Sequence, residues 1–388
     1  MKTKVITLTI LGFILASLLF ISLSIFTLSV GDLYAHAHPA MSINDFSYLI
    51  TIAYFVGMPL GKVIGRVFGM HRYPSVSVFL LVAFIAITIP ITFLTSNFYL
   101  LIFLRVVQGT STFLMEIFSI EYSKILDFEK RIIPSTISIG GIPSGVALGS
   151  FLVQYISLKN LLLLDIAIIS VGILFSLLLN NMNNDAPAEL SIKKKARHNF
   201  KNPLTWFMGL IWMSIAGFNL SLAVILPLYL EHEDPKLIIS AMNIFGYSAA
   251  IFTFVGGLIA YLIYERIKRQ SAVILIPVIS YIFTAIGFLV IILYGTLYIQ
   301  SAILLVNIEA MCIGIIYTVP KELFGEANYA NATWEFSFIG STGHIIVPLI
   351  LIPLSYSYGF RYVFMIYAVY PVIASLLFLR IRSYTYKG

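Results

Sequence analysis

Charged residues are scarce in this chain of 388 residues. Asp, Glu, Lys and Arg together make up 11% of the sequence, whereas 60% of it is hydrophobic and 14% is aromatic. A soluble domain carries about a quarter charged residues, because its surface must face water. The shortage therefore excludes an ordinary soluble globular protein and predicts that most of the surface faces lipid.

Cysteine and the signatures of common catalytic sites are also missing. The single cysteine, Cys312, excludes an internal disulfide framework and a metal cage built from cysteines. The sequence has no H-E-x-x-H, no G-x-S-x-G and no G-x-x-x-x-G-K-[ST] pattern, and its six histidines are scattered. We therefore expect no enzymatic activity, no cofactor, no metal site and no transport driven directly by ATP.

Long apolar segments recur along the whole chain. Each is long enough to cross a bilayer as a helix of roughly 20 residues. Several of the gaps between them hold only two to six residues, which makes neighbouring helices antiparallel. The predicted spans are 5–30, 46–64, 75–96, 98–122, 132–156, 160–180, 203–230, 238–263, 271–293, 296–319, 331–354 and 361–379. The sequence thus predicts an all-α membrane protein with twelve transmembrane helices.

The positive charge is distributed in a way that indicates orientation. The net charge of +7 comes from bases in short hydrophilic gaps, not along one amphipathic face, so we expect no nucleic-acid partner. With the N-terminus inside, 20 of the 24 Lys and Arg residues fall on inner segments and three on outer segments. Because cytoplasmic loops carry the excess of Lys and Arg, we predict a multi-pass protein of the plasma membrane with both termini cytoplasmic.

The longest polar stretch divides the chain into two halves. Residues 181–202 combine a polar run with a cluster of lysines, which is typical of a solvated linker on the cytoplasmic side. The predicted domains are therefore 1–180 and 203–388, each with six spans. Ile139-Gly140 and Ile339-Gly340 occur 200 residues apart in corresponding spans, which is consistent with an internal repeat.

Four short motifs occur in order in the first half. The gap after the second span reads G-K-V-I-G-R-V-F-G-M-H-R-Y at 61–73, and the fourth span contains R-V-V-Q-G at 105–109. The next inner gap holds E-K-R at 129–131, and the fifth span contains G-G-I-P-S-G-V-A-L-G at 140–149. Together these motifs resemble the major facilitator superfamily, whose first loop signature runs roughly G-x-x-x-D-R-x-G-R-[RK].

The resemblance implies two pseudo-symmetric six-helix bundles and a secondary transporter that works by alternating access, commonly as a monomer. In the first loop, Gly61, Arg66, Gly69 and Arg72 match the signature, and Gly65 stands where the family usually has an acid. The fifth-span motif is similar to that of the antiporter branches, with Pro143 displaced. Its hinge or packing residues would be Gly140, Gly141, Pro143, Gly145 and Gly149.

The first loop also has a physical interpretation without the family. Glycines spaced four residues apart from Gly57 to Gly69 leave one helix face without side chains, so another helix can approach closely. Arg66 and Arg72 lie at the membrane edge, where the nearest acids are Glu121 and Asp127. Such pairs would latch one conformation and release in another. Alternatively, the bases only fix the topology.

The fourth span carries a polar face that suggests a functional site. Gln108, Thr112 and Glu116 follow Arg105 at helical spacing in an otherwise apolar helix. Ionisable groups are costly within a bilayer and tend to face a cavity or a partner. We therefore predict that Arg105 binds an anion or takes part in proton coupling. A structural pair with another helix is the alternative.

The second half supplies further candidates for coupling and solute binding. Glu309 lies about two-thirds of the way through the tenth span, where a carboxyl group is a candidate proton carrier, and His344 is a second candidate acceptor. Asn219 and Asn307 are candidates for orienting a solute. A structural hydrogen bond is the alternative for both Glu309 and His344, and an interfacial role is expected for Asp165.

These patterns favour one function over several alternatives. We expect a transporter that moves a small-molecule solute through the bilayer, with protons as the coupling ion and efflux as the favoured direction. An uptake symporter, a passive facilitator and a ligand sensor on a transporter scaffold are the alternatives. The sequence specifies no substrate. Its 23 Tyr and 30 Phe residues are expected mostly to face lipid or the membrane interface.

Overall fold

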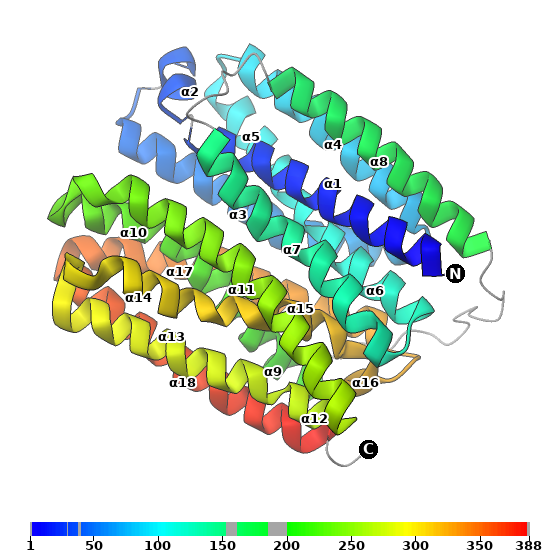
Figure 1. Ribbon diagram of the computed structural model, residues 1–388. Coiled ribbons are helices and arrows are strands. Elements are labelled where there is room, and N and C mark those ends of the chain that lie inside the picture. The colour runs from blue at the N-terminus through cyan, green and yellow to red at the C-terminus, as the bar shows by residue number, and fades with distance from the viewer. Residues whose placement is uncertain (1, 29, 38–39, 153–160, 185–199, 386–388) are drawn as a thin grey trace. The chain divides into compact units, whose positions relative to one another are not determined.

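The computed structural model describes residues 2–28, 30–37, 40–152, 161–184 and 200–385. Within these ranges the chain is helical, with short turns and no strand (Figure 1). The predicted all-α fold is therefore confirmed. The α-helices are α1 (Lys2–Leu28), α2 (Val30–Ala37), α3 (Ile43–Val67), α4 (Pro74–Leu94), α5 (Phe98–Gly109), α6 (Leu114–Ile125), α7 (Phe128–Leu152), α8 (Leu161–Asn184), α9 (Pro203–Trp212), α10 (Asn219–Glu233), α11 (Ile238–Ile267), α12 (Gln270–Val273), α13 (Leu275–Tyr294), α14 (Ile299–Asn307), α15 (Cys312–Thr318), α16 (Pro320–Phe324), α17 (Tyr329–Tyr358) and α18 (Phe360–Thr385).

The described residues contain eleven helical stretches that are long and apolar enough to cross a membrane. One of them, Gln270–Thr318, has 49 residues, which is more than one crossing needs. It reverses at Gly295, which has a positive φ of 60° that glycine adopts readily. Across the reversal, the Thr284 hydroxyl donates to the Val306 carbonyl at 2.9 Å. This stretch therefore holds two antiparallel passes, α13 and α14, and the total of twelve spans stays a prediction.

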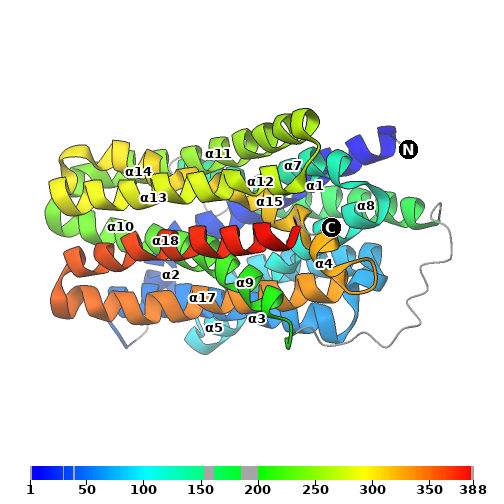
Figure 2. The ribbon, with the colours of Figure 1, turned by 90° about the horizontal axis from the view of Figure 1, so that it is seen from below.

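The chain divides into two compact units. Unit 1 comprises residues 1–125 and 137–195, and unit 2 comprises residues 126–136 and 196–388. Within unit 2, α13 and α18 run side by side in both views (Figures 1 and 2). Most of the linker predicted at 181–202, namely residues 185–199, lies outside the described residues.

The start of α7 differs from the predicted division of domains. Residues 126–136 are predicted to be part of the first bundle, yet they group with unit 2. The side chain of Thr136 occupies the space that a Cβ atom would need at Gly257 of α11 and at Gly314 of α15. Arg131, one turn earlier, donates to the carboxylate of Glu322 in α16. Close packing and an ion pair thus attach the first turns of α7 to unit 2.

Unit 1 contains the close helix contact that the glycine spacing predicts. A Cβ atom at Gly57 of α3 would overlap the Val106 carbonyl oxygen of α5, and one at Gly61 would lie 2.6 Å from the Thr110 carbonyl oxygen. Backbone therefore packs directly on backbone, as small residues allow between helices in a membrane. The same helix ends at Val67, and Gly69, two residues further on, has a φ of 60°, which is common just after a helix C-terminus.

Replacing Gly57 by alanine is expected to destabilise unit 1 more than replacing Gly172 by alanine. The new methyl group at Gly57 meets the Val106 backbone, whereas at Gly172 in α8 it meets the side chain of Val82, which can rotate. Overpacking typically costs about 1–3 kcal/mol, and the rigid contact should lie at the upper end. Thermal unfolding of both purified variants checks this. Equal unfolding temperatures would contradict the backbone contact.

The fourth and tenth predicted spans are interrupted at corresponding places. A 3₁₀ turn, Thr110–Phe113, separates α5 from α6, and another, Ile308–Met311, separates α14 from α15. In each unit a glycine packs against this turn: Gly61 against Thr110 in unit 1, and Gly256 against Met311 in unit 2. The shared arrangement supports an internal repeat, and both turns lie beside buried polar residues.

Candidate functional site

A buried carboxyl group in unit 2 collects hydrogen bonds from two other helices. Glu309 lies in the 3₁₀ turn that follows α14 and is fully buried. Its Oε1 accepts from Asn219 Nδ2 of α10 at 3.0 Å, and its Oε2 accepts from the Tyr370 hydroxyl of α18 at 2.6 Å. Three segments that are far apart in sequence therefore meet at one carboxyl group.

Asn307 extends this cluster to a further helix. Its Oδ1 accepts from Asn219 Nδ2 at 3.2 Å. Its own Nδ2 donates to the Phe245 carbonyl and to the Ser248 hydroxyl of α11, both at 2.7 Å. The structure thus brings together Asn219, Asn307 and Glu309, three residues that the sequence singled out separately. We call them, with Tyr370 and Ser248, the Glu309 cluster.

Local breaks in the helices place these side chains. A π-helical turn, Met213–Phe218, lies between α9 and α10 and immediately precedes Asn219. The 3₁₀ turn, Ile308–Met311, contains Glu309 and follows Asn307. A π turn and a 3₁₀ turn both change the direction in which the following side chains point, and π turns are frequent at functional sites. Regular helical spacing alone would not have predicted that these side chains converge.

Aromatic rings surround the same cluster. Phe218 stacks on Tyr370 with ring centres 4.1 Å apart, and Phe288 lies 5.0 Å from Tyr367 and 6.0 Å from Tyr370. The hydroxyl of Tyr281 lies 2.6 Å from that of Ser214 in the π turn. The aromatic residues were expected mostly to face lipid or the membrane interface, so these aromatic side chains around the Glu309 cluster were not predicted. No local signal separates Tyr370 from the other 22 tyrosines.

His344 makes a local contact. Its Nδ1 lies 3.0 Å from the Ser341 carbonyl of its own helix, α17, and the side chain is buried. A hydrogen bond to the carbonyl three residues earlier is a common arrangement for a structural side chain. The alternative was a hydrogen bond to another helix, which this contact within α17 does not test, so both roles of His344 stay predictions.

Arg105 lies in a separate polar cluster within unit 1. It is fully buried in α5, and its Nη1 donates to Gln108 Oε1 at 2.9 Å. Gln108 Nε2 in turn donates to the Thr92 hydroxyl of α4 at 3.1 Å. The guanidinium also lies over the ring of Tyr54 in α3, 5.0 Å from its centre, which is a favourable cation–π distance. The predicted neighbours Arg105 and Gln108 are therefore in contact.

The single polar face predicted for the fourth span is divided in the structure. Glu116 forms an ion pair with Lys62 Nζ of α3 at 2.7 Å, and both side chains are 0% exposed. Lys62 also donates to the Thr112 carbonyl. The 3₁₀ turn, Thr110–Phe113, shifts the register between the Arg105 cluster and this pair. Lys62 was counted only as one of the 20 bases on inner segments, so its buried partner was not predicted.

Replacing Arg105 by alanine is expected to reduce transport to the level of protein-free liposomes while leaving membrane insertion intact. The change removes the guanidinium that contacts Gln108 and Tyr54. Lysine at this position keeps the positive charge but lacks the planar guanidinium group and its several N–H donors. The Arg105→Lys variant should therefore retain only part of the activity. Solute flux and the amount of inserted protein are measured in parallel. Full activity of the alanine variant would leave Arg105 a structural role.

Both acids that were expected to take part in a latch with the arginines of the first loop have a lysine partner. Glu121 pairs with Lys124, and Asp127 pairs with Lys130, each three residues along its own segment. Pairs at this spacing are common on a helix surface. The latch between Arg66 or Arg72 and these acids stays a prediction.

The same loop contains a neutral histidine. His71 is buried, and burial together with the nearby charges of Lys124 and Arg72 lowers its pKa to about 4. Its carbonyl accepts a hydrogen bond from Lys124 at 2.9 Å. His71 therefore carries no charge at neutral pH. The first-loop signature that this motif resembles commonly has a base at this position.

The glycine-rich motif of α7 packs against α1. A Cβ atom at Gly141 would lie 2.5 Å from the Phe13 carbonyl oxygen, and one at Gly145 would overlap the Ser17 carbonyl oxygen. Gly140, Pro143 and Gly149 lie on the same continuous helix. This contact agrees with a packing role for the motif, whereas a hinge role stays a prediction.

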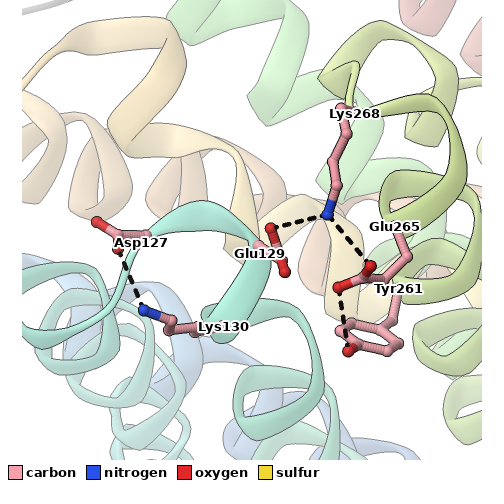
Figure 3. Close-up of polar contacts among 6 residues, drawn as sticks. All are labelled: Asp127, Glu129, Lys130, Tyr261, Glu265 and Lys268. Atoms are coloured by element: carbon pink, nitrogen blue, oxygen red, sulfur yellow. Dashed lines mark hydrogen bonds and ion pairs between the residues drawn. The ribbon is translucent and has the colours of Figure 1, made fainter.

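The start of α7 carries a network of exposed ion pairs within unit 2. Lys268 contacts Glu129 at 3.3 Å and Glu265 at 3.2 Å, and Tyr261 donates to Glu265 (Figure 3). The hydrogen bond that Lys268 donates to Glu265 is the main reason why the pKa of Lys268 is raised. The neighbouring Arg131–Glu322 pair is more buried, and burial raises the pKa of Glu322 although Arg131 opposes that shift. Together, these ion pairs attach residues 126–136 to the rest of unit 2.

No family model and no curated protein sequence matches this chain. Solved structures do match. The human organic anion transporter MFSD10 (TETRAN) has a TM-score of 0.73 and 12% identity, with 97% of this chain and 99% of that chain covered. A bacterial homologue of the iron transporter ferroportin, in an outward-facing state, has a TM-score of 0.70 and 15% identity, with 96% and 98% covered.

A third similar structure is the proton:xylose symporter XylE bound to 6-bromo-6-deoxy-D-glucose. It has a TM-score of 0.70 and 13% identity, with 98% of this chain and 96% of that chain covered. This structure is named as a member of the major facilitator superfamily. Likeness at such low identity shows the fold, and it does so over nearly the whole length of the chain. The chain has the fold of the major facilitator superfamily.

Proposed function

We propose that this protein is a secondary transporter that moves a small solute across a membrane by alternating access, coupled to protons. The observation that carries the proposal is the Glu309 cluster, a fully buried carboxyl group bound by side chains from two other helices, within a fold shared with carriers. A buried acid at membrane depth is costly and is typical of ion and proton pathways.

The hydrogen bonds of Glu309 suit a group that gains and loses a proton. Two donors, Asn219 Nδ2 and the Tyr370 hydroxyl, stabilise the ionised carboxylate. The low-dielectric surroundings stabilise the protonated form instead. Because the two effects oppose each other, a change in the position of either donor would change the affinity for a proton. This is the property that a coupling residue needs.

Unit 1 would supply the second polar site. Arg105, held by Gln108 and the Tyr54 ring, presents a permanent positive charge. We propose that it attracts an anionic or strongly polar group of a solute. Separately, within unit 2, we propose that Asn219 and Asn307 orient a solute. The three similar structures carry names that span an organic anion, iron and xylose, so the fold alone does not select among them.

The start of α7 is proposed to act as a conformational latch in addition to the first loop. The Arg131–Glu322 and Lys268–Glu129 pairs hold residues 126–136 within unit 2. Breaking these pairs would release that segment in another conformation.

Direction and location complete the proposal. We propose a monomer in the plasma membrane with both termini cytoplasmic, because the basic segments alternate in the way that cytoplasmic loops require. Efflux is the proposed direction, because the α7 glycines that resemble the antiporter motif pack on the α1 backbone. Flux measured in inside-out and right-side-out vesicles separates efflux from uptake.

The experiment that tests the proposal is a flux assay on purified protein in liposomes. Xylose, an organic anion and ferrous iron are offered first, followed by solutes selected in a growth screen of a deletion strain. Uphill movement of a solute under an imposed proton gradient is the expected result. Downhill flux alone would indicate a passive facilitator, and binding without any flux would indicate a sensor.

A further inference from the structure

A second acidic side chain is buried in a very different way from Glu309. Asp165 lies near the start of α8, inside the apolar stretch Leu163–Asn181. Its side chain is 4% exposed. Neither of its carboxyl oxygens has a hydrogen-bond partner among the residues that the structure describes. The interfacial role that the sequence analysis expected would instead leave the carboxyl group in contact with water or polar groups.

Among the described residues, the helices with the most extensive packing on α8 offer no charge to this group. These helices are α1 and α4. Leu164, next to Asp165, contacts the core formed by Ile21 and Ile25 of α1. Between Val5 and Leu28, α1 has no ionisable side chain, α4 has none, and α8 has only Asp165 itself. Neither helix therefore supplies a charge that could compensate for an ionised Asp165.

An ionised carboxylate is not stable in such a place. Moving a charge out of water is strongly unfavourable unless a partner or several hydrogen bonds compensate for it, and otherwise the group takes up a proton and becomes neutral. Glu309 has two donors that compensate for a charge, whereas Asp165 has none in the described part of the chain. The two acids therefore differ in their surroundings and not merely in their depth.

We propose that Asp165 is a proton-binding site in unit 1, occupied by a proton in this conformation and separate from the Glu309 cluster of unit 2. The ligand is the proton itself, and the binding atoms are the two carboxyl oxygens. Release of that proton requires water or a cation to reach the junction of α1, α4 and α8. The proposal is independent of any solute and of the Glu309 coupling step, and it holds whether or not the protein is a transporter.

Infrared difference spectroscopy tests this directly. Purified protein in lipid is titrated with acid and base, and the carbonyl stretching band of protonated carboxyl groups is recorded. At neutral pH the wild type is expected to show such a band at the high frequency that is typical of an acid without hydrogen bonds. D165N should lose this band, and E309Q should keep it. Carbon-13 labelling of aspartate in the wild type should shift the band, and labelling of glutamate should not.

Three results would overturn the proposal. The first is a wild type without the band at neutral pH. The second is a band that persists in D165N. The third is a band that appears only when Lys159, the nearest base in the sequence, is replaced by methionine, because Asp165 would then be an ionised partner of that lysine. If D165N fails to fold, the isotope shift in the wild type decides between the outcomes.

Discussion

Replacing Glu309 by glutamine is expected to end solute accumulation driven by a proton gradient while leaving downhill flux and exchange. Glutamine has the same shape as the protonated acid. Its oxygen can still accept from Asn219, and its amide can donate to the Tyr370 hydroxyl. The cluster should therefore stay folded while losing its carboxyl group. Accumulation, downhill flux and exchange are measured in the same liposome preparation.

A matched control separates coupling from a general effect of losing an acid. Glu326 is 65% exposed and pairs with Lys321, so replacing it by glutamine should leave all three fluxes unchanged. Tyr370→Phe removes one donor to Glu309 and should alter the pH dependence of accumulation without ending it. Intact accumulation in E309Q would remove Glu309 from the coupling role and leave it a structural hydrogen-bond acceptor.

Breaking the buried ion pair between Lys62 and Glu116 is expected to have the largest effect on stability. Both side chains are 0% exposed, so removal of one partner leaves an uncompensated charge inside the protein. Such changes typically destabilise by about 3–5 kcal/mol. Lys62→Met and Glu116→Met should each lower the free energy of unfolding by this amount. The double variant should recover most of it, because two apolar side chains of similar volume then replace the pair.

Unfolding of the two single variants, the double variant and the wild type forms a double-mutant cycle. Lys130→Met serves as the control. Its pair with Asp127 has side chains that are 68% and 88% exposed, and such surface pairs contribute about 0–1 kcal/mol. If the two single variants were as stable as this control, or if their effects simply added in the double variant, the pair would not be a buried unit.

Much of the fold could be predicted from the sequence, because lipid imposes a strong pattern. Apolar segments of the right length mark the helices, and the observed bounds, such as Pro74–Leu94 for the predicted span 75–96, agree within a few residues. The glycine spacing of α3 also predicted a close contact, which Gly57 and Gly61 form with α5 and the turn that follows it. These features depend on local composition and spacing, which a single sequence contains.

The arrangement of the polar residues could be predicted only in part. Asn219, Asn307 and Glu309 stood out because polar side chains are rare within spans, but their convergence depends on a π turn and a 3₁₀ turn. Nothing in the sequence marks either turn strongly. The same holds for the 3₁₀ turn that divides the polar face of the fourth span, which is why the pairing of Lys62 with Glu116 was missed.

Contacts between segments far apart in the sequence were not predicted. The attachment of residues 126–136 to unit 2 depends on Glu322 and on two glycines more than 100 residues away. Contacts of that range leave no periodic pattern in the sequence, so a single chain gives no signal for them.

Access to Asn219 from the two sides of the membrane tests alternating access most directly. Asn219 is partly buried and contacts Glu309, and the chain has a single native cysteine, the buried Cys312. An N219C variant in a C312A background is treated with a membrane-impermeant thiol reagent, applied to right-side-out and to inside-out vesicles. We expect labelling from both sides, with the balance between them shifted by an imposed proton gradient. Labelling from one side only, whatever the gradient, would contradict a carrier that opens to each side in turn.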